Sequence, residues 1–223
     1  MVVVGVDVGG EKKGFHAVAL RDGAYHRHEP SSRGGRATVD SILEWCRELD
    51  AQAIGVDAPC KWRQGENLRA AESQLKACRI ECFPTPRAEA AEDHPTANYR
   101  WMINGQALFR RLRSHYPLFK GETPSPSEKV CFESYPHAIA WHLEGGRVYA
   151  KDKRNKRKEL LLRANVDLPD GLGIDFVDAG LCALTALHLL SGEYKSYGDS
   201  QTGFIVVPRD PLAPHCLPRT PAV

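Results

Sequence analysis

Four short segments place a carboxylate where an apolar stretch ends or where a helix is expected to begin. They are Val2–Asp7, Ala53–Asp57, Val130–Glu133 and Ile174–Asp178. Asp is depleted in β-strands, and an acid buried beside apolar residues is costly unless a cation neutralises it. These segments therefore require a fold in which a cation can neutralise the carboxylates at the ends of several buried elements.

Apolar and turn patterns predict an α/β protein. The expected strands cover residues 2–8, 14–20, 24–28, 52–57, 130–134 and, less clearly marked, 203–207. Apolar residues at helical spacing predict helices over residues 38–49, 67–76, 96–115, 136–143, 154–164 and 175–190. A meander of three strands followed by strands separated by helices gives a mixed sheet covered by helices.

Composition narrows the functional classes. The 223 residues carry a formal net charge of only +2, so any surface for nucleic acid must be local. No apolar run reaches the length that spans a bilayer, and the N-terminus reads as a strand with no basic leader region. The seven cysteines include no CxxC pair. We therefore expect a cytoplasmic protein with free thiols and no membrane partner.

The candidate metal ligands follow from the strand ends. Asp7, Asp57 and Glu133 lie at or near the carboxyl ends of expected strands, where ligands of α/β sheets bind. Asp175 and Asp178 are three residues apart and so share one helix face. Carboxylate oxygens suit Mg²⁺ or Mn²⁺, and such ions are the usual apparatus for cutting phosphodiesters. We assign catalysis to Asp7, Asp57, Glu133 and Asp178, with Asp175 as a further metal ligand.

Each of these acids also has a purely structural interpretation. Asp57 precedes Ala58-Pro59 and would serve as an ordinary turn acid. Glu133 would favour the start of the following helix through the helix dipole, and Asp175 would cap the last predicted helix.

A basic run at residues 151–158 supplies the candidate contacts to substrate. Its cations would hold the phosphates of a nucleic acid without reading its sequence. The alternative is a solvated helix face. His137 either contacts phosphate or water, or has only a structural role. The assigned substrate-binding residues are Lys153, Arg154, Lys156, Arg157, Lys158 and His137.

The four acidic segments, together with Cys82-Phe-Pro-Thr-Pro86 and the basic stretch at 153–162, resemble the DUF429 family, a group regarded as predicted nucleases with a ribonuclease H-like fold. The resemblance covers most of residues 1–190. It implies a five-stranded mixed sheet, three antiparallel strands and then two parallel, flanked by helices. It implies that the first acid lies on the first strand, as Asp7 does. It also implies that the last acid lies early in a C-terminal helix, as in Holliday-junction resolvases, and Asp178 has this position.

We therefore expect one ribonuclease H-like domain over residues 1–207, with a helical insertion around 84–129 and a Pro-rich tail at 208–223. The expected function is a Mg²⁺- or Mn²⁺-dependent nuclease acting on DNA or RNA. Resolvase-like enzymes work as dimers, so the resemblance also implies a homodimer. Two alternatives stay open: a non-catalytic nucleic-acid or protein-binding module on the same scaffold, and a small nucleotide phosphohydrolase.

Overall fold

The computed structural model describes residues 1–29, 35–146, 152–209 and 211, and it contains one mixed sheet of seven strands. The strand order is β3-β2-β1-β4-β5-β7-β6. The strands are β1 (Val2–Val8), β2 (Phe15–Arg21), β3 (Ala24–Arg27), β4 (Ala53–Asp57), β5 (Val130–Ser134), β6 (Tyr194–Asp199) and β7 (Gly203–Pro208). The predicted Pro-rich tail lies almost entirely outside the described residues.

The first five strands form the arrangement that the resemblance implies. β1, β2 and β3 are antiparallel neighbours, and β4 and β5 continue the sheet in parallel with β1. Asp22 and Gly23 both adopt positive φ at the β2–β3 turn, which matches the twist of a two-residue hairpin. The expected mixed α/β class is confirmed. The expected count of five strands is wrong, because two more strands extend the sheet. β7 pairs in parallel with β5, and β6 forms the edge antiparallel to β7.

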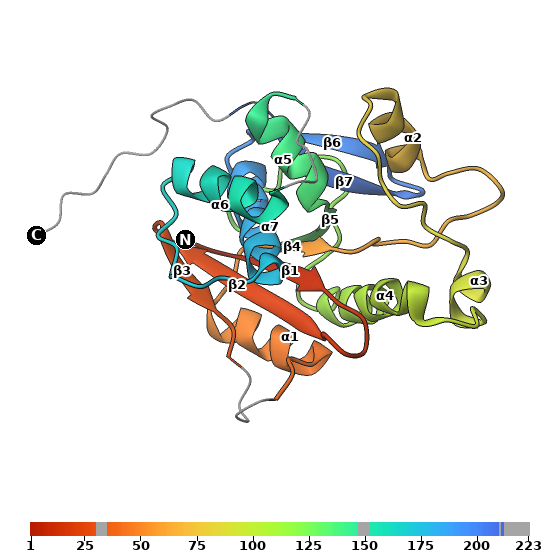
Figure 1. Cartoon of the computed structure of the whole chain (residues 1–223), viewed down its shortest axis with the longest axis horizontal. Helices are drawn as coiled ribbons and strands as arrows, with labels where there is room; N and C mark the ends of the chain where they lie inside the picture. The colour runs from red at the N-terminus through yellow and green to blue at the C-terminus, as the bar shows by residue number, and fades with distance from the viewer. Residues whose placement is uncertain (30–34, 147–151, 210, 212–223) are drawn as a thin grey trace, which may run out of the picture.

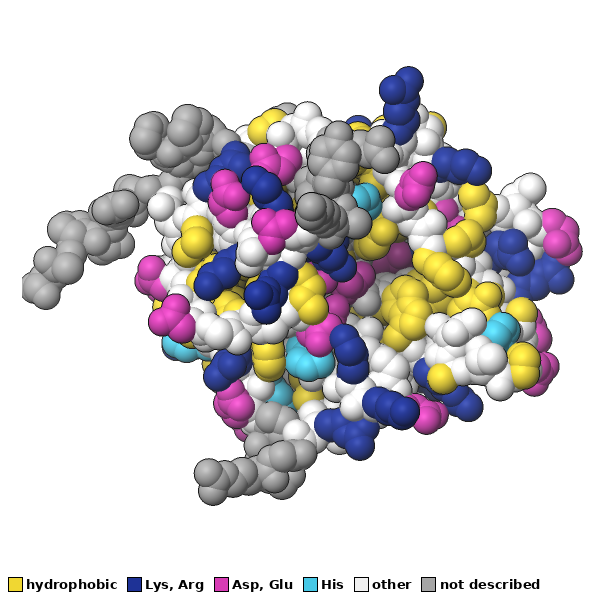
Figure 2. All heavy atoms as spheres, viewed as in Figure 1, with side chains coloured by type: hydrophobic (Ala, Val, Ile, Leu, Met, Phe, Trp, Pro, Cys, Tyr) yellow, Lys and Arg dark blue, Asp and Glu magenta, His cyan; other side chains and the backbone are white. Residues whose placement is uncertain are grey.

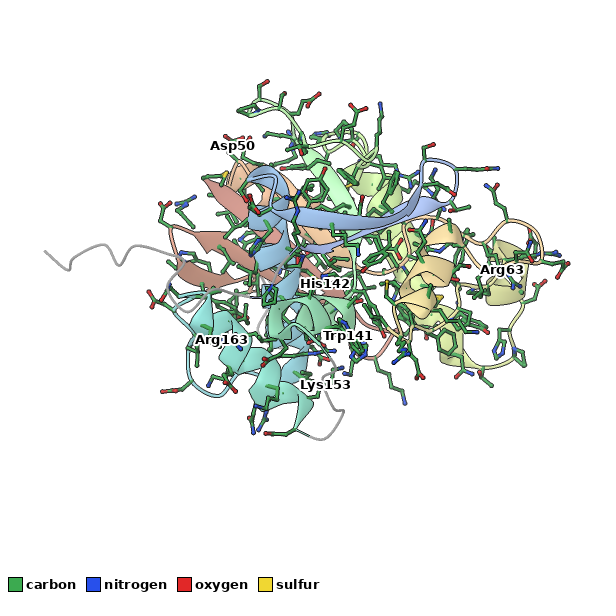
Figure 3. The ribbon with its side chains drawn as sticks, turned by 90° about the horizontal axis from the view of Figure 1, so that it is seen from above. Asp50, Arg63, Trp141, His142, Lys153 and Arg163 are labelled. Carbon is green, nitrogen blue, oxygen red and sulfur yellow. The ribbon has the colours of Figure 1, made fainter. Side chains whose placement is uncertain are left out.

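Helices cover both faces of the sheet (Figure 1). One face carries α5 (Pro136–Glu144), α6 (Lys153–Arg163) and α7 (Ile174–Leu190), and the other carries α1 (Val39–Glu48) and α4 (Arg100–Leu112). The remaining elements are α2 (Ala70–Ala77), α3 (Ala88–Glu92) and a 3₁₀ turn at Ala97–Tyr99. Seen from above, α5 and α6 lie together, with Lys153 at the start of α6 and Trp141 and His142 on α5 (Figure 3).

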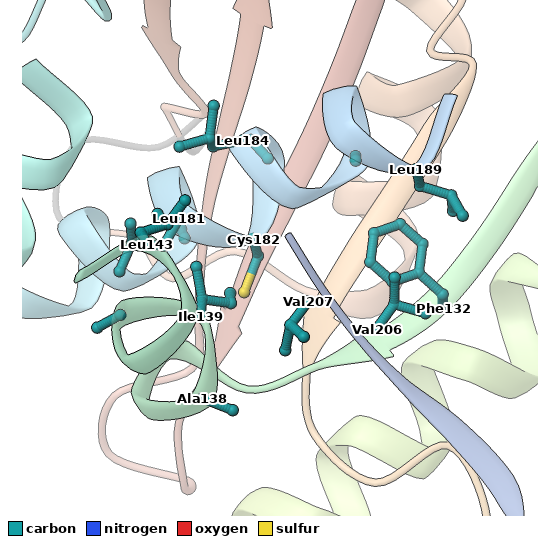
Figure 4. Packing of buried hydrophobic residues seen from close by; sticks show 14 of the residues in the cluster. Phe132, Ala138, Ile139, Leu143, Leu181, Cys182, Leu184, Leu189, Val206 and Val207 are labelled. Atoms are coloured by element: carbon teal, nitrogen blue, oxygen red, sulfur yellow. The ribbon is translucent and has the colours of Figure 1, made fainter. Parts of the chain in front are cut away.

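Helix α7 is buried along most of its length, as its apolar sequence predicts. Leu181, Cys182 and Leu189 contribute to a cluster with Ile139 of α5 and Phe132 of β5 (Figure 4). A second cluster on the opposite face joins α1 and α4 to the same strands. Among the described residues, no helix combines the length and apolar character needed to cross a bilayer.

Two glycines allow α7 to lie directly on the sheet. A Cβ placed on Gly5 of β1 would lie 1.9 Å from the carbonyl oxygen of Ala179, and one on Gly55 of β4 would lie 2.6 Å from that of Cys182. Real Cβ atoms do not approach backbone oxygens so closely. The helix backbone therefore contacts the strand backbone at these two points, and this fixes its height above the sheet.

Gly5→Ala is expected to destabilise the protein by about 3 kcal/mol or more, since the added methyl group can be accommodated only by lifting α7. Elsewhere in a strand the same change would be favourable, because glycine weakens strands. Urea unfolding would measure the difference. Gly146→Ala is the control: no atom of another described residue lies within 4 Å of the place that its methyl group would occupy, so its midpoint should stay near that of the parent. Equal stability of both variants would contradict the close contact.

Candidate metal centre

Asp7 and Asp57 lie side by side at the carboxyl ends of β1 and β4. They are direct partners in the parallel register, in which neighbouring strands are about 4.8 Å apart. Side chains alternate across a strand, so each Asp shares the face of the glycine two residues before it. Gly5 and Gly55 both face α7. The two carboxylates therefore point to the side of the sheet that α7 covers.

Asp178 reaches the same place from α7. It lies on the turn of the helix just before the contact of Ala179 with Gly5, and it is only 5% exposed. Burial raises the pKa of Asp57 well above its ordinary value, and the negative charges of Asp7 and Asp178 raise it further. Burial also raises the pKa of Asp178, against the opposing effect of nearby cations. The structure therefore brings together three of the predicted acids.

Helix α6 supplies cations to this acidic cluster. Arg157 is 3% exposed and donates a hydrogen bond from Nη1 to Oδ1 of Asp178 at 2.5 Å. Lys153, one helical turn earlier, places Nζ 3.6 Å from Oδ2 of Asp178. Arg157 and Lys153 are thus the members of the basic run that meet the acids. The arginine Nε is buried without a hydrogen-bond partner among the described residues, so the guanidinium is only partly satisfied.

Lys13 and Asp175 form a second ion pair at the edge of the cluster. Nζ of Lys13 donates to Oδ1 of Asp175 at 2.8 Å. The hydrogen bond that Lys13 donates to Asp175 raises the pKa of Lys13, and Asp7 and Asp178 contribute smaller effects of the same sign. Asp175 is therefore close to the other acids but is engaged by a lysine that sequence reasoning did not identify.

His16 is a further neighbour that the sequence analysis missed. It is the cross-strand partner of Asp7 on β2, and its Nδ1 lies 3.7 Å from Oδ2 of Asp7. That nitrogen is buried and makes no hydrogen bond within the described residues. The ring meets Phe176 edge-on, with centroids 5.0 Å apart. The sequence gives no sign of this contact except the position of His16 in the second predicted strand. That position indicates a neighbour of Asp7 only once the β1–β2 register is known.

The structure does not bring Glu133 into this cluster. Glu133 pairs in register with Val56, whose side chain packs in the cluster beneath α1 and α4. It therefore faces away from Asp7 and Asp57. Its carboxylate accepts two hydrogen bonds from Arg69, at 2.5 and 2.8 Å, and one from the backbone N–H of Cys60 at 2.8 Å. Arg69 also binds Glu72, so Glu133 belongs to a buried ionic network.

The other members of the basic run point elsewhere. Arg154 and Lys156 are exposed, Lys158 is partly buried, and Lys156 pairs with Glu159 at 3.4 Å. His137 lies nearer the acids and lines a groove that Asp57 and Asp178 also line. Its pKa is lowered, first by burial and then by Arg157 and Lys153, so it is neutral at pH 7.

An open groove of about 490 Å³ leads to the acids. Figure 2 shows acidic side chains in a hollow, with Lys and Arg on one side and hydrophobic side chains on the other. The groove is lined by Asp57, Glu81, Cys82, Phe83, Pro84, Tyr135, Pro136, His137, Lys153, Arg157 and Asp178. The Cys82-Phe-Pro-Thr-Pro86 segment therefore belongs to the site.

The donor set fits a hard divalent cation in part. Within the described residues no group of three or more His, Cys, Asp or Glu side chains is arranged to hold a metal. Arg157 engages Asp178, and Lys13 engages Asp175. In contrast, the carboxylates of Asp7 and Asp57 accept no hydrogen bond from any described residue. Mg²⁺ is commonly bound by one or two carboxylates with water and phosphate oxygens completing its shell. Asp7 and Asp57 offer that pair, and Asp178 is the adjacent third carboxylate.

Asp57→Asn is expected to stabilise the metal-free protein at neutral pH. Because the folded-state pKa of Asp57 is raised above its ordinary 3.8, the folded state holds a proton that the unfolded state has released, so stability falls as pH rises through that interval. The variant removes this loss. Thermal unfolding in EDTA from pH 4 to 8 should show a flatter profile and a higher Tm at pH 7.

Asp170→Asn, at an exposed acid, is the control and should follow the parent. If Asp57→Asn proved less stable than the parent at pH 7, the electrostatic strain between the acids would be disproved.

Glu133→Gln is expected to lower stability by about 3 kcal/mol, because it breaks a buried ion pair and leaves the Arg69 guanidinium undercompensated. Its affinity for Mn²⁺ should equal that of the parent. Chemical unfolding and calorimetry would measure the two quantities. Weakened Mn²⁺ binding with unchanged stability would instead return Glu133 to the metal-binding set.

Comparison with known proteins places the chain in a family. No curated protein matches it. Among solved structures it is similar to Thermus thermophilus RuvC, with 16% identity, 86% of this chain and 97% of that chain covered, and a TM-score of 0.38. A structure of T. thermophilus RuvC in complex with a Holliday junction substrate is similar at 15% identity, with 86% and 96% covered and a TM-score of 0.38. The model of a family described as protein of unknown function, DUF429, matches residues 5–202, which is most of the sequence, and the chain belongs to that family.

Proposed function

We propose that this protein is a divalent-metal-dependent nuclease, with Mg²⁺ or Mn²⁺ held by Asp7, Asp57 and Asp178. One observation carries the proposal: Asp7 and Asp57 are register partners on one face of the sheet, and neither carboxylate accepts a hydrogen bond from a described residue. Burial, and then the charges of Asp7 and Asp178, raise the pKa of Asp57. An acidic pair of this kind is stabilised by a cation. Bound there, the metal would activate water and neutralise charge on a phosphoryl group.

The chain's own residues divide the remaining work. Asp7 and Asp57 would hold the cation from the sheet, and Asp178 would hold it from α7. Asp175 would become a further metal ligand if Lys13 left it to bind the substrate. His137 is neutral at pH 7 and lines the groove, so it can donate to a phosphate oxygen or accept a proton from water.

Arg157 and Lys153 are the proposed phosphate-binding pair. A guanidinium binds phosphate through two parallel hydrogen bonds, and a buried arginine with an unpartnered Nε has a donor to offer. When Arg157 turns to the substrate phosphate, Asp178 is released toward the cation. Arg154, Lys156 and Lys158 would then contact the backbone farther along α6, independently of base sequence. The homodimer and the cytoplasmic location stay predictions.

The non-catalytic binding module is the second candidate, and one observation favours it. Arg157 closes Asp178 with a hydrogen bond of 2.5 Å, so the third ligand is not free in this conformation. If the closed state persisted with substrate bound, the groove would bind an anion without cutting it.

Asp7→Asn is expected to reduce Mn²⁺-dependent cleavage by at least about 100-fold, because it removes a direct metal ligand. Cleavage of labelled single- and double-stranded DNA and RNA would be measured with Mn²⁺, Mg²⁺ and EDTA. Asp170→Asn should retain the parent rate, and Tm would confirm that both variants fold.

Three outcomes separate the candidates. Cleavage that survives Asp7→Asn would overturn the proposed centre. Metal-independent binding of polymer by the parent, with no turnover, would support the binding module. Turnover of mononucleotides with a shallow salt dependence would indicate the small nucleotide phosphohydrolase, because polymer binding releases many counterions and gives a steep slope.

A further inference from the structure

The groove has an aromatic wall that the metal centre does not use. Phe83 lines the groove and is 58% exposed, one of three large hydrophobic side chains described as exposed, with Met1 and Leu162. Met1 is a chain end and Leu162 lies on the surface of α6. Phe83 alone among them adjoins the acids. An exposed apolar ring that lines a groove beside charged groups offers a contact surface to a ligand.

The loop that presents Phe83 is anchored on both sides. Tyr135 donates from its hydroxyl to the carbonyl oxygen of Glu81 at 3.0 Å, and the backbone N–H of Thr85 donates to Oε1 of Glu72 at 3.0 Å. The N–H of Arg63 donates to the carbonyl oxygen of Pro86 at 3.1 Å. Pro84 and Pro86 restrict the backbone further. The ring is thus held in place before any ligand arrives, which lowers the entropic cost of binding.

A second ring supports Phe83. Tyr99 meets it edge-on with centroids 6.0 Å apart and an interplanar angle of 64°, and His94 meets Tyr99 at 4.8 Å and 85°. Such edge contacts are favourable and orient the Phe83 ring. The exposed fraction of Phe83 shows that much of the ring is left for another partner.

The groove therefore has two chemically different walls. Phe83 and Pro84 form the apolar wall, and Lys153 and Arg157 form the cationic one; the neutral His137 and the acids Asp57 and Asp178 also line the groove. A ligand that satisfies both walls has a flat apolar part and an anionic part a few ångströms away. A nucleotide has this pattern: the base stacks on an aromatic ring and its phosphate meets the cations.

We propose that Phe83 is a stacking platform for an unpaired nucleobase, so that the substrate is single-stranded nucleic acid or an unpaired segment of it. The inference rests on the proposed function and specifies its substrate class. Within a duplex, neighbouring base pairs cover both faces of every base, so stacking on a protein ring needs an unpaired or extruded nucleotide. An aliphatic segment of a protein would cover Phe83 as well but would leave the cationic wall unused.

Phe83→Leu tests the proposal, because leucine keeps apolar volume and removes the aromatic face. The affinity for a labelled single-stranded oligonucleotide, measured by fluorescence anisotropy in EDTA, is expected to fall about tenfold, as for the loss of one base–aromatic stack. Phe83→Trp should bind within about twofold of the parent or more tightly. Leu162→Ala is the control for loss of an exposed apolar side chain and should not change affinity.

A strand of abasic sugar phosphates completes the test. The parent should bind it about tenfold more weakly than the base-containing strand, and Phe83→Leu should cause no further loss on it. Equal affinity of parent and Phe83→Leu for the base-containing strand would overturn the proposal, as would an equal loss on duplex and single strand, or no single-strand binding at all.

The two proposals fail separately. Phe83-dependent binding with no metal-dependent cleavage would support stacking and overturn the nuclease. Asp7-dependent cleavage that is indifferent to Phe83→Leu and favours duplex would support the nuclease and overturn stacking.

Discussion

The site depends on the backbone contact between α7 and two strands of the sheet. Gly5 and Gly55 have no side chain where the carbonyl oxygens of Ala179 and Cys182 approach. Two residues beyond these glycines, Asp7 and Asp57 emerge on the same face, just where α7 begins. A helix held one side-chain layer higher would keep Asp178 from the strand ends. The close packing that stabilises the core therefore also determines the separation of the acids.

Two acidic groups on opposite faces of the sheet illustrate how environment sets the role of a carboxylate. Glu133 and Glu72 enclose Arg69, and these three residues are almost fully buried with their hydrogen bonds directed at one another. Asp7 and Asp57 have no such partner among the described residues, and Asp57 lines an open groove. Both groups arise from acids near strand ends. Only the second leaves oxygen lone pairs for a ligand. It does so at the cost of burial and of repulsion between the acids, which together raise the pKa of Asp57.

Much of this arrangement could be predicted from sequence, for a definite reason. Carboxylates inside the apolar runs ending at Asp7 and Asp57 violate strand preferences, and the apolar periodicity of Ile174–Leu190 identifies a buried helix that carries Asp178. The face that Glu133 occupies could not be predicted, because it depends on whether β5 pairs with β4 through odd or even positions. Lys13, His16 and Arg69 gave no signal, since their roles arise only from contacts between distant segments. The strand at Tyr194–Asp199 was not predicted because its polar residues resemble a loop. This strand, β6, lies at the edge of the sheet, where one of its two long edges needs no neighbouring strand.

Arg157 connects the metal centre to the groove. Its ion pair with Asp178 keeps a buried acid from remaining uncompensated while the cation is absent, which a lone carboxylate at 5% exposure would not tolerate well. A phosphate in the groove competes for the same guanidinium, and a cation beside Asp7 and Asp57 competes for the same carboxylate. Either ligand therefore weakens the pair that opposes the other. Metal and substrate should consequently favour each other's binding, by a coupling free energy that is equal in both directions.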